Sequence, residues 1–384
     1  MKVAVLGYGT VGAGVYSMLS DAPGMEAGPV LVRPGKAVES FMVSDAALIF
    51  GNPTVDAVVE TLGGLDPAYS YGMRALEAGK HFITANKAMV AAHGLELAAL
   101  AREKGAAFLF SAACGGGVPF LHNLTLSAET DRIEAVSGIL NGTTNYMLDA
   151  MQRRSLSYGD ALREAQSLGY AESDPTADVS GLDALRKMQL ACAVAFGVLP
   201  QSGMLCEGME HFTAADVEDI QRRGLVCRLM ARGSRAGESV SAYVEPVLFP
   251  RAAPESSVFT NNNMARYTGK RCGSIVLMGQ GAGRFPTASA VLRDLAAAQQ
   301  GARSMFPENC RAAEADNREA VHSYYIRTGG FAAVRLPLRS VLAQGEVVRA
   351  VTEPMSAEKM HALAQNIRKD GNDLFFAALE EELC

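Results

Sequence analysis

The chain has 384 residues, of which 49% are hydrophobic and 20% are charged, a composition typical of globular proteins with a sizeable core. At roughly 100–200 residues per domain, this length predicts two or three domains. The net charge of −6, from 35 basic and 41 acidic residues, argues against a broad electrostatic surface for nucleic acid or for an anionic membrane.

Neither the N-terminus nor the cysteines suggest secretion. The apolar run in MKVAVLGYG is interrupted by glycines where the apolar region of a signal peptide would continue. No stretch approaches the ~20 apolar residues of a membrane span. Seven cysteines without CxxC pairs indicate neither a disulfide framework nor a zinc site. We therefore expect a cytoplasmic protein with reduced thiols.

Strands and helices alternate from residue 1 to about 125. The predicted strands are KVAVLG, GPVLVR, DAVVET, HFITA and AAFLFSA, and the predicted helices are TVGAGVYSMLS, PAYSYGMRALEAGK and GLELAALAREKG. Because the strands lack in–out alternation, they indicate a parallel sheet covered on both faces. The expected fold class is α/β, beginning with a Rossmann-type dinucleotide-binding domain.

The pattern changes after this point and predicts a separate α+β domain over residues 126–283. Its strands are RIEAVSGIL, LVCRLMARGS, SVSAYVEPVLF and GSIVLMGQ, and its helices include TTNYMLDAMQRR and a long apolar helix from GLDALRK onward. The helix FPTASAVLRDLAAAQQ, within residues 284–318, is expected to pack back on the first domain. The strand HSYYIRT and the helix AEKMHALAQNIRK predict a small third module over residues 319–384.

The segment GYGTVG is a G-x-G-x-x-G motif that directly follows a strand and opens a helix, which is the context that dinucleotide binding requires. Gly7 permits the tight turn, Gly9 lets the backbone approach a pyrophosphate, and Gly12 lets helix and strand pack closely. The second strand ends in Arg33 and Lys36 in place of an acid, and basic groups suit a 2′-phosphate. The motif predicts a dinucleotide site that favours NADP, with NAD as the alternative.

Two later loops also follow strands of the first domain. Lys87 in ITANKAMV would lie at the carboxyl end of the sheet, where ligands bind in such folds, although a lysine that merely starts a surface helix has the same pattern. The glycines of SAACGGGVPF require unusual dihedrals or a close backbone approach. Cys114 beside them is either the nucleophile of an acylating semialdehyde dehydrogenase or a buried thiol.

The loop GYAESDPTADVSGLDALRK carries acids and a lysine into the long apolar helix. Asp183 and Lys187 are four residues apart and share one helical face. An exposed pair of this kind is worth only ~0.3–0.5 kcal/mol. The alternative is that the acids hold a substrate ammonium group while a buried lysine acts as a proton donor. A non-enzymatic dinucleotide sensor, in which the cluster is structural, also fits the pattern.

The motifs GYGTVG, ITANKAMV, GGGVPF, LNGTTNYML and GYAESDPTADVSGLDALRK occur in this order and are followed by GQGAGRFPTASAVLRDL. Together they resemble homoserine dehydrogenases over residues 1 to about 300. The resemblance implies the NAD(P)-dependent interconversion of L-aspartate 4-semialdehyde and L-homoserine in threonine and methionine biosynthesis. It also implies that residues 126–283 bind the substrate and form the dimer interface, in a homodimer or a dimer of dimers.

The resemblance assigns roles to single residues. It implies that Lys187 donates a proton to the aldehyde oxygen, that Asp183 orients Lys187, and that Lys87 lies on the cofactor side and assists proton transfer. The implied substrate-binding residues are Glu172, Asp178, Gly142 and Thr143. The implied cofactor-binding residues are Gly7, Gly9, Thr10, Val11, Gly12, Arg33, Lys36, Thr61, Lys87 and Gly281.

Two features depart from the family pattern. Homoserine dehydrogenases bind a monovalent cation, Na or K, largely through backbone carbonyls, which the resemblance assigns here to Cys114, Gly116 and Val118. Ser111 stands where many members have a glutamate. The tail begins like a regulatory ACT domain but lacks the D-x-P-G-V-L turn, so we expect a shortened, degenerate version.

Overall fold

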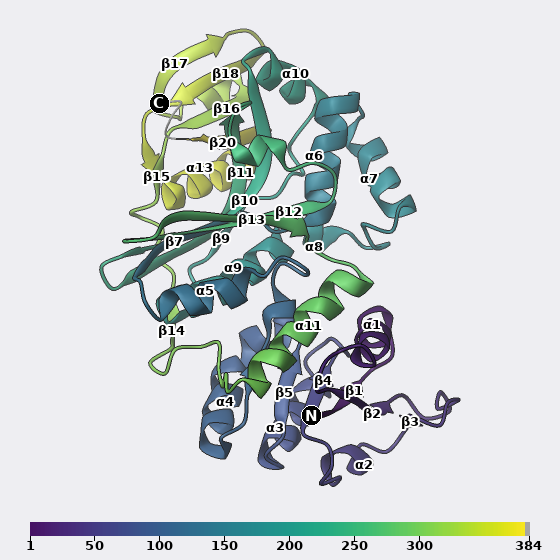
Figure 1. Cartoon of the computed structure of the whole chain (residues 1–384). Helices are drawn as coiled ribbons and strands as arrows, with labels where there is room; N and C mark the ends of the chain where they lie inside the picture. The colour runs from purple at the N-terminus through teal and green to yellow at the C-terminus, as the bar shows by residue number, and fades with distance from the viewer. Residues whose placement is uncertain (381–384) are drawn as a thin grey trace. The chain divides into compact units, whose positions relative to one another are not determined.

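The chain forms two compact units in this computed structural model, which describes residues 1–380 (Figure 1). Unit 1 comprises residues 1–133, 189–199 and 269–311, and unit 2 comprises the rest of the described chain. The expected domain boundaries near residues 125 and 283 remain an interpretation of the sequence. No helix among the described residues is long and apolar enough to cross a membrane.

A parallel sheet lies at the centre of unit 1, with the strand order β3-β2-β1-β4-β5-β6 that is typical of dinucleotide-binding folds. All five strands predicted for this region are present. The sequence pattern does not predict β3, because its two residues lie in the short apolar run FMV, whereas the two residues of β6 lie in the longer run AAFLF. The strands are β1 (Lys2–Leu6), β2 (Glu26–Leu31), β3 (Met42–Val43), β4 (Ala57–Glu60), β5 (His81–Thr84) and β6 (Phe108–Leu109).

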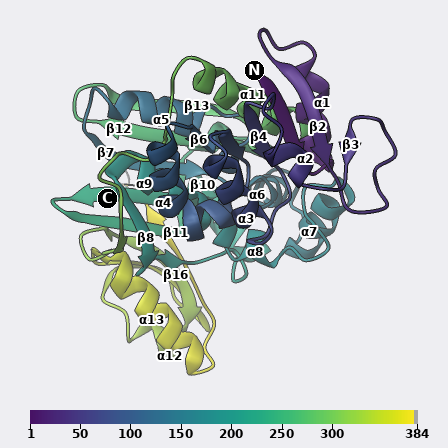
Figure 2. The ribbon, with the colours of Figure 1, turned by 90° about the horizontal axis from the view of Figure 1, so that it is seen from below.

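Helices of unit 1 pack in pairs. Helix α1 lies against α11, and a Cβ placed on Gly14 of α1 would come within 2.8 Å of the Arg284 carbonyl oxygen. Helices α3 and α4 lie side by side (Figure 2). The helices are α1 (Thr10–Leu19), α2 (Ala47–Phe50), α3 (Ala68–Glu77), α4 (Lys87–Lys104), α5 (Phe120–Ala128) and α11 (Arg284–Gln299), with a 3-10 turn η1 (Ser111–Ala113).

Helix α4 begins at Lys87, earlier than the predicted GLELAALAREKG. The reason is its cap, because the Asn86 side chain accepts a hydrogen bond from the backbone N–H of Met89 at 3.1 Å. At the other end Gly105 adopts a left-handed conformation with φ 65°, which ends the helix. Lys87 is therefore the first residue of α4, directly after the carboxyl end of β5.

A mixed sheet of ten strands occupies most of unit 2, in the order β13-β12-β7-β10-β11-β20-β16-β18-β17, with β9 paired to β11. Its longest hairpin joins β10 to β11 through Gly237 and Glu238, and pairs Leu225 with Pro250 and Ala236 with Ser239. These strands are β7 (Ile133–Ile139), β9 (Leu205–Cys206), β10 (Leu225–Ala236), β11 (Ser239–Pro250), β12 (Asn262–Gly269), β13 (Gly273–Gln280), β16 (Tyr324–Gly329), β17 (Leu338–Ala343), β18 (Val347–Thr352) and β20 (Leu374–Leu379).

The remaining elements surround this sheet or connect its strands. Short two-stranded ladders pair β8 with β14 and β15 with β19. Helix α9 starts at the predicted position and continues beyond residue 188, where the chain passes from unit 2 to unit 1. These elements are α6 (Gly142–Arg154), α7 (Tyr158–Ser167), α8 (Thr176–Val179), α9 (Leu182–Phe196), β8 (Val198–Ser202), α10 (Ala214–Arg222), η2 (Pro254–Ser257), β14 (Arg311–Glu314), β15 (Val321–His322), α12 (Gly330–Ala333), β19 (Met355–Ser356) and α13 (Ala357–Lys369).

The C-terminal segment follows the order β16-α12-β17-β18-α13-β20, and its strands lie as β20-β16-β18-β17. This is the connectivity of a ferredoxin-like βαββαβ unit. The helix α12 has only four residues, and β20 pairs in parallel with β11, so the segment continues the sheet of unit 2 (Figure 1). A shortened ACT-like module stays our interpretation of this geometry.

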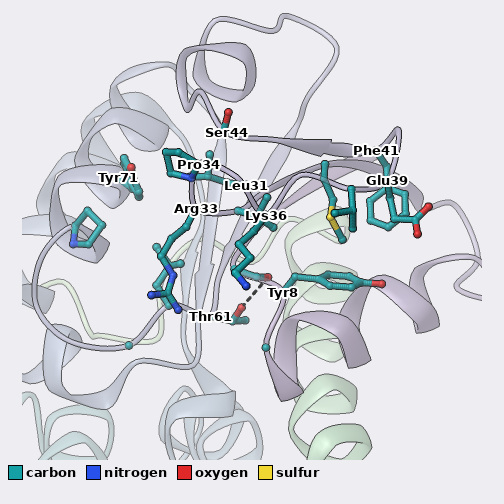
Figure 3. A pocket seen from close by; sticks show the side chains of 18 residues that line it. Tyr8, Leu31, Arg33, Pro34, Lys36, Glu39, Phe41, Ser44, Thr61 and Tyr71 are labelled. Carbon is teal, nitrogen blue, oxygen red and sulfur yellow. Dashed lines mark hydrogen bonds between the residues drawn. The ribbon is translucent and has the colours of Figure 1, made fainter.

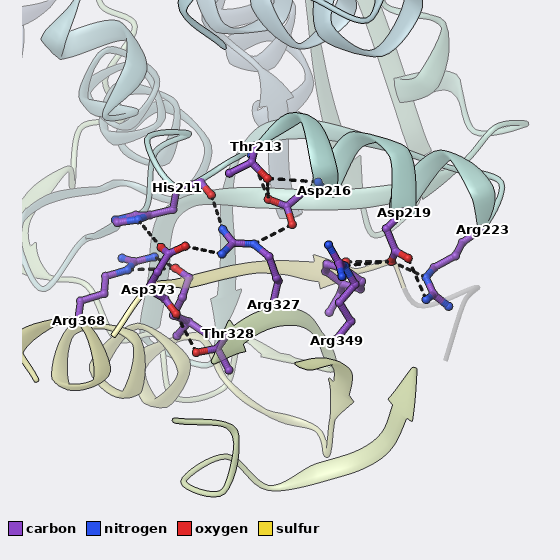
Figure 4. Close-up of polar contacts among 12 residues, drawn as sticks. His211, Thr213, Asp216, Asp219, Arg223, Arg327, Thr328, Arg349, Arg368 and Asp373 are labelled. Carbon is purple, nitrogen blue, oxygen red and sulfur yellow. Dashed lines mark hydrogen bonds and ion pairs between the residues drawn. The ribbon is translucent and has the colours of Figure 1, made fainter. Parts of the chain in front are cut away.

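Ion pairs fasten this segment to α10 within unit 2 (Figure 4). The Arg327 guanidinium on β16 donates to the Asp216 carboxylate at 2.8 Å, to the Asp373 carboxylate and to the His211 carbonyl oxygen. Asp216 is fully buried, and Arg327 is only 8% exposed. Because a buried charge is costly unless it is paired and hydrogen-bonded, this network fixes β16 against α10.

Candidate active site

A pocket of about 1010 Å³ lies in unit 1 at the carboxyl ends of the parallel strands (Figure 3). Ligands bind at this edge in open α/β sheets. The glycine loop after β1 forms one wall, the segment after β2 a second, and the segment after β4 a third. Five of the residues predicted to bind the cofactor line it, namely Gly7, Gly9, Arg33, Lys36 and Thr61.

The glycine loop has the geometry that its sequence predicts. Gly7 adopts φ 97°, a conformation that favours glycine, and its N–H bonds to the Leu31 carbonyl oxygen at 3.0 Å. A Cβ at Gly12 would collide with the Gly7 carbonyl oxygen, whereas a Cβ at Gly9 would have no atom within 4 Å. Gly9 occupies the N-cap position of α1 and has no side chain that could cap the helix. The helix N-terminus is therefore open to a phosphate group.

Two basic side chains extend into this pocket from the segment after β2. Figure 3 shows Arg33 and Lys36 both directed into the hollow above Thr61. On another side, Tyr8 packs near Phe41, with ring centroids 5.8 Å apart, and Phe41 stacks on Tyr16 at 4.3 Å. The pocket thus joins an open helix N-terminus and two cations to an aromatic wall, a combination that fits a phosphorylated dinucleotide.

A second group of predicted residues gathers in unit 2 at the N-terminus of α6. The Lys187 ammonium lies 2.7 Å from the Asp183 carboxylate, and each side chain is only 12% exposed. Lys187 also donates to the carbonyl oxygen of Leu140 at 2.5 Å, just after β7 ends. The pair is therefore held inside the fold and is not an exposed ion pair on a helix surface.

Asn141 joins the two aspartates of this group. Its Nδ2 atom donates to Asp178 at 2.6 Å and to Asp183 at 2.9 Å, while its Oδ1 atom accepts from the backbone N–H of Thr144 at 2.8 Å. One amide thus caps α6 and holds two carboxylates in place. The Thr143 hydroxyl lies 3.1 Å from the other oxygen of Asp178 and 2.6 Å from the Tyr170 carbonyl oxygen.

The surroundings of Asp178 affect its protonation. Burial raises the pKa of this carboxyl group, and the nearby negative charge of Asp183 raises it further. The hydrogen bonds from Asn141 and Thr143 and the positive charge of Lys187 oppose this rise in pKa. A half-buried acid beside a second acid is a favourable place for a substrate cation, because the cation stabilises both carboxylates.

The glycine-rich loop after β6 is anchored by a buried acid of unit 1. The Ser111 hydroxyl donates to the Asp294 carboxylate at 2.5 Å, and the Ser111 N–H donates to its other oxygen at 2.8 Å. Burial raises the pKa of Asp294 to about 7. Gly116 adopts φ 52°, and a Cβ there would collide with the Gly281 carbonyl oxygen. This packing explains why the loop needs glycine.

The other predicted residues lie outside these two groups in the described chain. Gly281 packs on the glycine-rich loop, Lys87 begins α4, and Thr10 and Val11 lie in the first turn of α1. Glu172 has an exposed side chain, and its carbonyl oxygen accepts from the Gln166 side chain at 3.1 Å. The roles of all these residues, namely Gly281, Lys87, Thr10, Val11 and Glu172, remain predictions. Cys114 is fully buried, as expected for a structural thiol.

In the sequence, Asn141 lies between a predicted strand and a predicted helix, where asparagine commonly caps the helix. The structure adds its two bonds to the aspartates, together with the lysine-binding carbonyl of Leu140. The only signal available in the sequence was the position of Asn141 between a strand and a helix. No pattern indicates that residues 178 and 183 come back to it, because that contact depends on the path of the intervening loop.

Comparison with known proteins gives a consistent result. A family model described as homoserine dehydrogenase matches residues 119–296, and a model for the NAD-binding domain of homoserine dehydrogenase matches residues 7–111. The homoserine dehydrogenase of Corynebacterium glutamicum is 38% identical over 317 residues, which cover 77% of this chain and 71% of that protein. The homoserine dehydrogenase of Bacillus subtilis is 34% identical over 319 residues, which cover 79% of this chain and 74% of that protein.

Solved structures agree with these sequence matches. A homoserine dehydrogenase from Thiobacillus denitrificans superimposes with a TM-score of 0.87 at 29% identity, covering 99% of this chain and 98% of that one. The Staphylococcus aureus enzyme at pH 8.5 gives a TM-score of 0.77 at 27% identity, covering 99% of both chains. A hyperthermophilic archaeal homoserine dehydrogenase in complex with NADPH gives a TM-score of 0.67 at 25% identity, covering 81% of this chain and 99% of that one.

Proposed function

Because the chain belongs to the homoserine dehydrogenase family, we propose that the side chains gathered at the N-terminus of α6 carry out the proton chemistry of the family's reaction. This oxidoreductase interconverts L-aspartate 4-semialdehyde and L-homoserine, a step of threonine and methionine biosynthesis. The Asp183–Lys187 pair, held by Asn141 and the Leu140 carbonyl oxygen, is the observation that supports the proposal.

Lys187 is the proposed proton donor to the aldehyde oxygen. The bound nicotinamide dinucleotide supplies the hydride in one direction and accepts it in the other. As negative charge develops on the substrate oxygen, the Lys187 ammonium stabilises it and transfers a proton to it. Asp183 keeps the ammonium oriented, since the two groups are 2.7 Å apart. In the oxidation direction Lys187 takes the hydroxyl proton, so alkaline pH favours this direction.

Asp178 is the proposed partner of the substrate ammonium group, assisted by Glu172. A carboxylate has about four acceptor positions, and Asp178 uses two of them for Asn141 and Thr143. The backbone N–H groups at the N-terminus of α6, beginning at Gly142, suit the substrate carboxylate. This arrangement would select an α-amino acid over a simple alcohol. Lys87 remains a predicted second lysine for proton transfer.

NADP is the proposed preferred dinucleotide. Arg33 and Lys36 extend into the pocket of unit 1, and two cations next to the ribose position favour a 2′-phosphate. The pocket geometry fits the nucleotide, because Gly9 leaves open space before α1. The preference is tested by comparing kcat/KM for NADP and NAD.

A monovalent cation, Na or K, is proposed at the carbonyls of Cys114, Gly116 and Val118. Carbonyl oxygens are ligands that hard cations accept. The loop is held at Ser111 by Asp294 and in its middle by the bond from the Gly117 N–H to the Gln280 carbonyl oxygen at 3.0 Å. Thermal unfolding in KCl or NaCl against N-methylglucamine chloride at equal ionic strength tests this site without an activity assay.

The function is tested by adding L-homoserine and NADP to the purified protein at alkaline pH and following the absorbance of NADPH. Turnover with L-homoserine, and none with L-serine, is the expected result. Absence of turnover with either dinucleotide in well-folded protein would refute the proposal. Gel filtration with light scattering tests the further proposals of a homodimer or dimer of dimers, and fractionation of expressing cells tests the cytoplasmic location.

A further inference from the structure

Glu60 is a buried acid that the proposed mechanism does not use. It is the last residue of β4, beside the pocket residue Thr61, and it is 0% exposed. The rest of the strand, Ala57 to Val59, is apolar. Burial of a carboxylate is costly unless several donors satisfy it, so its presence in this strand requires a reason.

One oxygen of Glu60 fixes the loop that follows its own strand. Its Oε1 atom accepts from the backbone N–H groups of Leu62 at 2.6 Å and Gly63 at 3.1 Å. Gly63 and Gly64 both have positive φ, 77° and 73°, so this loop has a defined and glycine-dependent turn. Thr61, Leu62 and Gly63 all line the dinucleotide pocket. The carboxylate therefore sets the shape of one pocket wall.

Thr61 connects this wall to the glycine loop. Its hydroxyl donates to the Leu6 carbonyl oxygen at 2.9 Å and lies 3.4 Å from the Gly7 carbonyl oxygen. A Cβ at Gly12 would lie only 2.7 Å from the Thr61 hydroxyl, so the two loops are in tight contact. A shift of the loop after β4 would therefore disturb the turn that is expected to hold the pyrophosphate.

The other oxygen of Glu60 reaches the next strand. Its Oε2 atom accepts from the Thr84 hydroxyl at 2.6 Å, and the Thr84 oxygen accepts from the Asn86 N–H at 2.9 Å. The Asn86 side chain then donates to the Gly64 carbonyl oxygen at 2.6 Å and caps α4. This chain of bonds returns to the loop after β4 and also fixes the first residue of α4, Lys87.

We infer that Glu60 is a positioning residue for the dinucleotide: its buried carboxylate joins the loops after β4 and β5 and fixes the pocket wall formed by Thr61–Gly63. Glutamine cannot replace it fully, because its Nε2 atom cannot accept a hydrogen bond. In Glu60→Gln the amide group would present a donor either to the Leu62 and Gly63 N–H groups or to the Thr84 hydroxyl, whose oxygen already accepts from Asn86.

The experiment compares NADPH binding, measured by the fluorescence of the nucleotide, with the KM for L-homoserine and with Tm. Glu60→Gln and Thr84→Val should each raise the Kd for NADPH about tenfold, the loss expected for one hydrogen bond to a charged group. The KM for L-homoserine should stay near the wild-type value. Thr84→Ser, which keeps the hydroxyl, should bind NADPH normally. The exposed Glu77→Gln, in α3 of the same unit, is the matched control.

The outcomes separate positioning from a purely structural role. A lower Tm with an unchanged Kd in both Glu60→Gln and Thr84→Val would overturn the inference. If Glu60→Gln does not fold, the comparison of Thr84→Val with Thr84→Ser decides alone. Serine keeps the hydroxyl that donates to Glu60, and valine removes it. The inference rests on the dinucleotide-binding function. Wild-type protein that binds neither NADPH nor NADH would refute that function, whereas equal binding by wild type and variants would refute only the role of Glu60.

Discussion

Replacement of Lys187 by methionine tests the proposed proton donor most directly, because it keeps the length of the side chain and removes the charge. Lys187 and Asp183 are each 12% exposed and 2.7 Å apart. Removal of one partner of a largely buried pair typically costs about 3–5 kcal/mol of folding free energy. Loss of a general acid lowers kcat by roughly 10²–10⁴-fold. Both effects are therefore expected in Lys187→Met.

The two effects can be measured apart. Urea unfolding gives the free energy of unfolding, NADPH fluorescence gives the Kd for the dinucleotide, and NADP reduction with L-homoserine gives kcat. In the double variant Lys187→Met/Asp183→Asn, the uncompensated carboxylate is removed, so much of the stability should return while kcat stays low. Arg186→Met, which removes an exposed cation from the same helix, is the matched control and should keep both stability and activity.

Two results would refute this reasoning. A wild-type kcat in folded Lys187→Met would exclude Lys187 as the proton donor. A low kcat that recovers in the double variant would show that the defect came from the unpaired Asp183 charge and not from loss of the acid.

Three further predictions concern unit 1. Cys114→Ala should keep most of the activity, because the thiol is fully buried, and loss of activity would favour the acylating mechanism. Arg33→Ala combined with Lys36→Ala should lower kcat/KM for NADP far more than for NAD, and an equal decrease would contradict the proposed 2′-phosphate contact. The pKa of Asp294 is raised from 3.8 to about 7, so the folded state retains this proton over that range and the unfolded state does not. Stability should therefore fall as pH rises through this window, by roughly 4 kcal/mol at about 1.4 kcal/mol per pH unit, and Asp294→Asn should abolish this dependence in urea unfolding measured across pH.

The sequence of the first domain was sufficient to predict its fold, because most of its elements carry a local signal of their own. Buried parallel strands are continuous apolar runs. A tight turn from a strand into a helix requires glycines, here Gly7 and Gly12. The boundaries were less accurate where a cap decided them, as at Asn86. The strand β3 and the helix α2 were not predicted, because their short apolar runs carry no periodic signal. The helix α5 was not predicted either.

The candidate site shows a different limit. The sequence by itself determined that an acid and a lysine share one face of α9, since residues 183 and 187 are separated by about one helical turn. Only the tertiary structure decided that this face is enclosed, that the Leu140 carbonyl oxygen receives the ammonium, and that one Asn141 amide holds both aspartates. These contacts join residues more than 35 positions apart, and no local sequence pattern specifies the path of the chain between them.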